Sequence, residues 1–212
     1  MSMKYNGTAW FMMTRIMKKP LRRRYGKAAD KYIKDSKEIY RQMLLDADDI
    51  GAGNPMKGNI YGAFPIMAVW KAAGGAITTE DPDGIIDEMM HSSLVKKVVG
   101  RGDFNDPQYV RRLRASFGGY KKWADEHAEY TDKTWDFNFD DTLHEQGLIY
   151  HFTRYPLNDF ARKNGFLEVL PCMCRMDYAT TALKHGVLHR KNTLAEGGDI
   201  CDYWFVVDRA EK

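Results

Sequence analysis

The stretch Trp135-Asp136-Phe137-Asn138-Phe139-Asp140 alternates aromatic residues with polar ones. Successive side chains of a strand point to opposite faces, so this alternation predicts a strand with one buried and one exposed face. The residues before it lack such alternation and carry apolar residues three and four positions apart, which is typical of helices. The chain therefore changes from helical to strand-rich at about residue 131.

Upstream of this change, residues 25–47 carry apolar residues at helical spacing with Lys and Asp between them. Pro20 is expected to separate this helix from a shorter one before it, because proline disrupts a helix interior. Residues 107–129 predict a long charged helix, and Asp106 is placed to cap its first turn.

Residues 60–73 are apolar on nearly all sides of the predicted helix. Such a segment belongs to the core, lines a pocket or meets a partner chain, so a homodimer through this segment is one interpretation. A shorter helix is expected over residues 83–92, with Thr79 as a candidate cap.

Downstream of residue 131, further strands and two helices are expected. The predicted strands are 148–153, 187–190 and 200–207, and the predicted helices are 157–164 and 171–183. We predict a single α+β domain over residues 1–212, in which a mainly helical part (1–130) precedes a strand-rich part (131–212). The strand-rich part is expected to form an antiparallel sheet with packed helices.

Composition excludes several classes of protein. The chain has 212 residues, of which 44% are hydrophobic and 29% charged, as in ordinary globular proteins. A net charge of +3 does not demand a polyanion, so we expect no nucleic-acid partner. The 3 cysteines do not suit a disulfide framework, and no apolar run is long enough for a membrane span. We expect a reduced, cytoplasmic protein that does not contact a membrane.

Reactive residue types concentrate in two segments, 172–177 and 190–203. In a helix that starts at Pro171, Cys174 and Asp177 lie on one face, because residues three apart are neighbours. In a final strand, Cys201 and Asp202 point to opposite faces. Only one of these two can point directly into a given pocket, and we expect the other to be structural.

The thiols admit three interpretations. Each buried Cys can be a small apolar side chain. Cys174 and Cys201 could instead join one of the six His in a zinc site, although Cys-x-Cys spacing is unusual for zinc. A third interpretation is a nucleophilic thiolate, for which His185 and His189 are candidate bases. We expect neither a metal nor a cofactor.

Three motifs together resemble the L-2-amino-thiazoline-4-carboxylic acid hydrolase family. They are Cys174-x-x-Asp177, Arg190-x-x-Thr193-Leu194-Ala195-x-Gly197 and Cys201-Asp202-Tyr203, and the segment from Tyr155 to Gly165 is similar as well. Many family members carry Cys where this chain has Tyr155. A more distant resemblance links the late Gly-rich turn, the following Cys and the closing strand to the 4-vinyl reductase domain and its trafficking-complex relatives.

The resemblance implies hydrolytic opening of a small carboxylated cyclic amidine or thiazoline, with cleavage of a C–N or C–S bond. It implies two sets of site residues around a small-molecule substrate, namely catalytic Cys174, Asp177 and Cys201, and substrate-binding Arg190, Thr193 and Asp202. Arg190 suits a carboxylate because a guanidinium binds it in a bidentate manner. The alternative functions are a small-molecule binding or sensor domain without turnover, or another C–N hydrolase of the same family.

Overall fold

The computed structural model describes residues 2–78, 80–144 and 146–209. One antiparallel sheet is formed by four strands, in the spatial order β1-β2-β4-β3. They are β1 (Asp136–Phe139), β2 (Leu148–Arg154), β3 (Gly186–His189) and β4 (Cys201–Val207). The alternating stretch that opens the strand-rich part is thus the edge strand β1.

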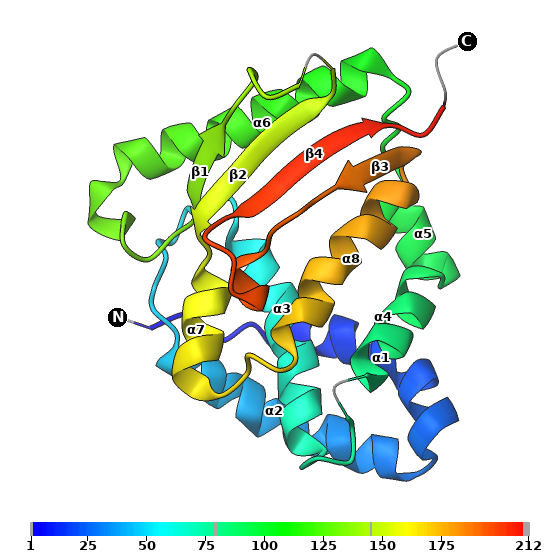
Figure 1. Cartoon of the computed structure of the whole chain (residues 1–212). Coiled ribbons are helices and arrows are strands. Elements are labelled where there is room, and N and C mark those ends of the chain that lie inside the picture. Colours follow the sequence, from blue (N-terminus) through cyan, green and yellow to red (C-terminus); the bar gives the residue numbers. More distant parts are fainter. Residues whose placement is uncertain (1, 79, 145, 210–212) are drawn as a thin grey trace.

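Helices make up the rest of the described regular structure (Figure 1). The α-helices are α1 (Gly7–Tyr25), α2 (Ala28–Asp46), α3 (Lys57–Ala72), α4 (Asp81–Met90), α5 (Ser93–Val99), α6 (Pro107–Glu126), α7 (Pro156–Asn164) and α8 (Leu170–Ala182). Two short 3-10 helices are η1 (Ala128–Tyr130) and η2 (Leu194–Glu196). The predicted α+β class, with helices preceding an antiparallel sheet, is confirmed.

Local signals place several helix ends correctly. The Asp106 side chain caps α6 by accepting a hydrogen bond from the Gln108 amide at 2.8 Å. Gly165 ends α7 with a φ of 75°, a left-handed conformation that glycine adopts without steric cost. Thr79, the candidate cap of the next helix, lies outside the described residues.

The expected break at Pro20 is wrong. Pro20 lies inside α1, and the helix instead ends at Tyr25, where it is followed by the capping residue Gly26 with a φ of 56°. Proline removes one backbone hydrogen bond, but Pro20 is buried against the core, and tertiary packing of this kind stabilises most helices in proteins.

The apolar segment in α3 belongs to the core of this chain. Phe64 is buried and packs on Phe160 of α7, with 4.5 Å between the ring centroids. Trp70, at the end of the same helix, packs against Phe166. The helix therefore buries its apolar sides against the helical part and against α7 and the residues just after it.

The sheet has two chemically different faces, as the strand parity predicts. Tyr150 of β2 pairs with Tyr203 of β4, and their rings stack at 4.6 Å on the inner face. Helix α6, which runs behind β1 and β2 in Figure 1, places Phe117 against Tyr150. On the outer face, Trp204 stacks with His144. The inner face is therefore the one that can form a site with the helices.

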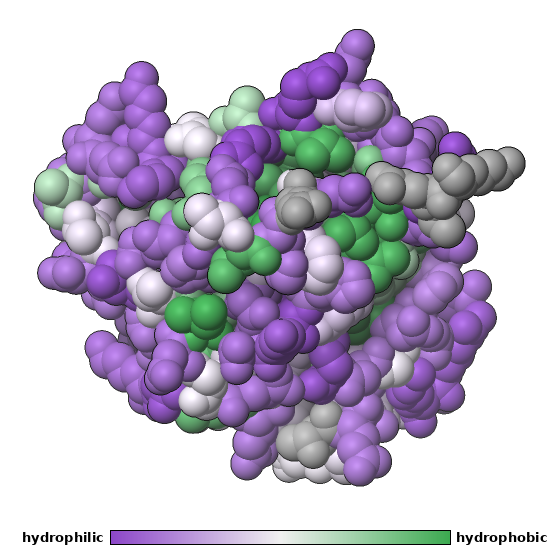
Figure 2. Space-filling model, turned by 45° about the horizontal axis from the view of Figure 1, so that its top comes forward, coloured by the Kyte–Doolittle hydropathy of each residue, from purple (hydrophilic) through white to green (hydrophobic). Residues whose placement is uncertain are grey.

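The surface drawn in Figure 2 is largely hydrophilic, with hydrophobic side chains gathered in separate spots. Among the described residues, no helix combines the length and the apolar character that crossing a membrane requires.

Candidate functional site

A cavity of about 470 Å³ lies between the inner face of the sheet and helices α3, α6 and α8. Its wall is mainly aromatic and methionine-rich. Its lining includes Met13, Gly62, Phe117, Trp135, Tyr150, Tyr155, Met173, Met176, Asp177 and Tyr203. A volume of this size falls in the range of ~300–1,000 Å³ that is typical of small-molecule sites.

Asp177 is the only charged side chain among the described residues that line this cavity. Its Oδ2 accepts a hydrogen bond from Arg190 Nη2 at 2.7 Å and another from the Tyr203 hydroxyl at 3.1 Å. Within the described residues, its Oδ1 has no hydrogen-bond partner. One carboxylate oxygen is therefore held by the protein, and the other remains as an acceptor for a ligand or a water.

Arg190 lies behind Asp177 and uses its donors within the protein. Its Nη1 donates to the Cys174 carbonyl at 2.9 Å, and its Nε donates to the Asp202 carbonyl at 3.2 Å. The guanidinium also lies over the Tyr203 ring, 4.0 Å from its centroid. The Arg190 side chain is only 2% exposed, against 37% for Asp177. The arginine therefore holds the carboxylate, and the carboxylate lines the cavity.

The surroundings of Asp177 shift its protonation. Burial raises the pKa of the Asp177 carboxyl, and this outweighs the lowering by Arg190 and by the Tyr203 hydrogen bond. Burial also raises the pKa of Tyr150, Tyr155 and Tyr203 well above the ordinary value. These hydroxyls are thus protonated at neutral pH, while Asp177 has the raised pKa of a candidate general base.

The two candidate catalytic thiols are buried outside the cavity wall. Burial raises the pKa of Cys174 to about 12 and raises the pKa of Cys201 as well. Cys201 Sγ accepts a hydrogen bond from the Leu194 amide at 3.2 Å, which ties β4 to the preceding loop. Neither environment stabilises the thiolate that a nucleophile requires.

The two remaining predicted residues hold the loop between β3 and β4. The Asp202 carboxylate accepts from the Lys191 and Asn192 amides at 2.9 and 2.6 Å. Thr193 caps η2, where its Oγ1 accepts from the Glu196 amide and donates to the Glu196 carboxylate. Cys201 and Asp202 lie on opposite faces of the sheet, as predicted, and it is Cys201 that shares the inner face with Tyr203.

The structure therefore brings the predicted residues into one region but gives them different positions. Asp177 lines the cavity, whereas the other predicted residues surround it or hold the adjacent loop; those are Cys174, Arg190, Thr193, Cys201 and Asp202. The sequence reasoning missed Tyr150, Tyr155 and Tyr203 as wall residues. Strand alternation could have identified Tyr203, because it lies on the same strand face as the candidate residue Cys201.

Metal-binding residue types do not cluster in the part of the chain that the structure describes. No group of three or more His, Cys, Asp or Glu side chains lies there in an arrangement that could hold an ion. All three cysteines are free and buried.

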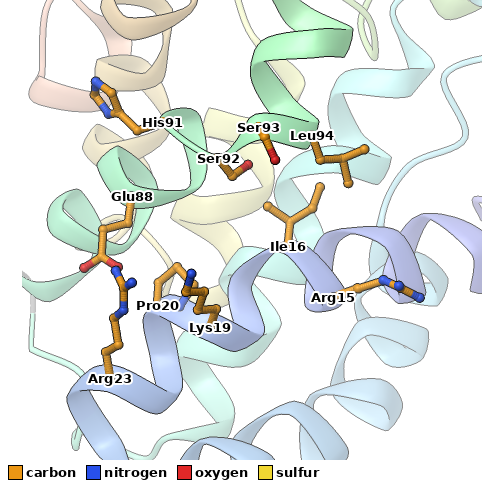
Figure 3. A pocket seen from close by; sticks show the side chains of 10 residues that line it. All are labelled: Arg15, Ile16, Lys19, Pro20, Arg23, Glu88, His91, Ser92, Ser93 and Leu94. Carbon is orange, nitrogen blue, oxygen red and sulfur yellow. The ribbon is translucent and has the colours of Figure 1, made fainter.

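A second hollow, of about 420 Å³, lies between α1 and the end of α4 (Figure 3). Figure 3 shows Glu88 directed toward Arg23, and the two form an ion pair of 3.0 Å. Arg24 also pairs with Glu88, at 2.5 Å, and Ser92 caps α5. Because two arginines neutralise Glu88, the described residues of this hollow offer no free carboxylate, and the cavity with Asp177 is the stronger candidate.

The comparison with known families finds one match. A family model described as L-2-amino-thiazoline-4-carboxylic acid hydrolase matches residues 58–205, a span that begins in α3 and ends in β4. Neither a curated protein nor a solved structure matches the chain.

Proposed function

The chain belongs to the L-2-amino-thiazoline-4-carboxylic acid hydrolase family, and from this premise we propose that it hydrolyses a C–N or C–S bond in a small cyclic amidine. The observation that carries the proposal is Asp177, an oriented carboxylate and the one charged side chain among the described residues of the cavity wall. Such a group can accept a proton from water or bind the N–H groups of an amidine. Either task would promote this reaction.

The proposed reaction adds one water across the ring. Asp177 takes a proton from a water, and the resulting hydroxide attacks the carbon between nitrogen and sulfur. The C–S or C–N bond of the tetrahedral intermediate then breaks, and Asp177 returns the proton to the leaving atom. For a thiazoline opened at sulfur, the product is a carbamoylated aminothiol. Arg190 and Tyr203 orient the carboxylate through Oδ2, which leaves Oδ1 for proton transfer.

The direct test is incubation of the purified protein with L-2-amino-thiazoline-4-carboxylate and with 2-amino-2-thiazoline. Mass spectrometry should detect a product heavier than its substrate by about 18 Da, the mass of one water. Binding of either compound without any such product would contradict the hydrolase proposal and favour a sensor.

The thiols are proposed to be structural, so their removal should spare catalysis. Cys174→Ala is expected to keep kcat/KM within about threefold of the unmodified protein, because a protonated buried thiol is neither nucleophile nor base. The measurement is steady-state turnover, with Cys172→Ala as the matched control. A loss of about a hundredfold with Cys174→Ala alone would restore the nucleophilic interpretation.

The pH profile should show the titration of Asp177. We expect kcat/KM to fall as the pH is lowered through the pKa of this base, because protonated Asp177 cannot accept a proton. Burial raises that pKa, so the acid limb should lie above the range of an exposed Asp. Tyr203→Phe removes a hydrogen bond that lowers the same pKa, and should move the limb to higher pH. An unmoved limb, or one moved to lower pH, would contradict the assignment.

A further inference from the structure

The wall of the cavity contains no positive counterpart for a substrate carboxylate. Among the described lining residues, the only charged side chain is the acidic Asp177, and the rest are apolar, aromatic or neutral polar groups. A carboxylate placed there would lose its hydration and would lie near a second carboxylate. An amidinium would instead meet the acceptor oxygen of Asp177 and the faces of aromatic rings.

The cationic side chains near the cavity do not provide a partner for a substrate carboxylate either. Arg190 is 2% exposed, and its hydrogen bonds go to Asp177 and to two backbone carbonyls. Tyr203 lies against its guanidinium, so a ligand in the cavity contacts the ring instead. Lys184 also acts on Asp177 electrostatically, but it is not among the lining residues. A substrate carboxylate in this cavity would therefore have no bidentate partner of the kind that Arg normally supplies.

Accepting the proposed function, we infer that this cavity takes amidines that carry an apolar or aromatic group and no carboxylate. The amidine nitrogen atoms would bind Asp177, and the apolar group would pack on Phe117, Tyr150 and the methionines of the wall. The volume of about 470 Å³ suits such a compound, since small-molecule sites span ~300–1,000 Å³. Substrate selection is thus expected to differ from what the family description implies.

The test compares two compounds that differ only in a carboxylate, benzamidine and 4-amidinobenzoate, by isothermal titration calorimetry on the full chain. Benzamidine is expected to bind at least about tenfold more tightly, because it spares the desolvation and repulsion of the acid group. Asp177→Asn should remove most benzamidine affinity. Asp159→Asn, the same change at an exposed Asp outside the cavity wall, should not.

Each outcome has one meaning for the inference. Equal or tighter binding of 4-amidinobenzoate, or no binding of either compound, would overturn it. The hydrolase proposal is judged separately, by thiazoline turnover. If no thiazoline reacts but the benzamidine preference remains, the proposed reaction fails and the ligand class stands.

Gly62 offers a second, steric test of the same cavity. A side chain at Gly62, which lines the cavity from α3, would meet no atom within 4 Å at its Cβ. Gly62→Leu should therefore leave the protein equally or more stable, because Leu favours helix more than Gly does. Benzamidine affinity should fall at least about tenfold, because the Leu side chain occupies the ligand volume. Gly118→Leu, in the middle of α6 and equally open, is the matched control. Unchanged benzamidine affinity in Gly62→Leu would contradict a ligand in this cavity.

Discussion

Replacing Asp177 with Asn is expected to lower kcat/KM by about 10²–10⁴-fold, the usual contribution of a positioned general base. The change is nearly isosteric, and the amide oxygen can still accept hydrogen bonds from Arg190 and Tyr203. The amide cannot accept the proton of the attacking water or pair with an amidinium. The loss should therefore be chemical, and circular dichroism and thermal unfolding should show a folded protein.

Two controls make this result specific to Asp177. Asp159→Asn removes a charge outside the cavity wall and should leave turnover unchanged. Asp177→Glu restores a carboxylate but displaces it by one methylene, so it should recover part of the activity. Full activity in Asp177→Asn would remove this residue from the mechanism and leave the proposed reaction without its base.

Replacing Arg190 with Met should produce the largest loss of stability among these variants. Removing one partner of a buried ion pair leaves an uncompensated charge and unpaired acceptors, which costs about 3–5 kcal/mol. Here the lower end, about 3 kcal/mol, is expected, because Asp177 retains 37% exposure and is partly solvated. Urea unfolding measured by tryptophan fluorescence gives the free-energy difference.

A double-mutant cycle separates charge from packing at this pair. Combining Arg190→Met with Asp177→Asn removes both charges, so the double variant should be more stable than the sum of the single losses predicts. Additive losses would mean that the two side chains do not interact as the 2.7 Å contact implies. In either case, Arg190→Met should also impair turnover, because it releases the carboxylate that Arg190 orients.

Local patterns along the chain predicted most of the fold. Aromatic alternation identified β1, and capping chemistry located the start of α6 and the end of α7. These signals work because they depend on residues close in sequence. Pro20 was misjudged because its effect on α1 depends on packing against distant parts of the chain.

For the site, the motifs located the region of the cavity, but not the position that each residue takes in it. Spacing along α8 predicted that Cys174 and Asp177 lie on one face. In the structure Cys174 is buried, and only Asp177 of the two lines the cavity. Arg190 suits a carboxylate ligand when considered alone. In the folded protein its donors go to Asp177 and to two backbone carbonyls. The aromatic residues of the wall come from α6, β2 and β4 and from the segments before β1 and α7, and no single motif contains them.

The amino-acid sequence was sufficient for the α+β class, the parity of β4 and the resemblance to a hydrolase family, because each of these rests on periodicity or on a motif. Only the tertiary structure decided which charged group lines the cavity and which are enclosed behind it. The physical reason is that solvation, pKa and hydrogen-bond partners depend on atoms brought together across the whole chain. Asp177 and Arg190 show this most clearly. They are 13 positions apart in sequence and form an ion pair in which Asp177 lines the cavity and Arg190 is buried behind it.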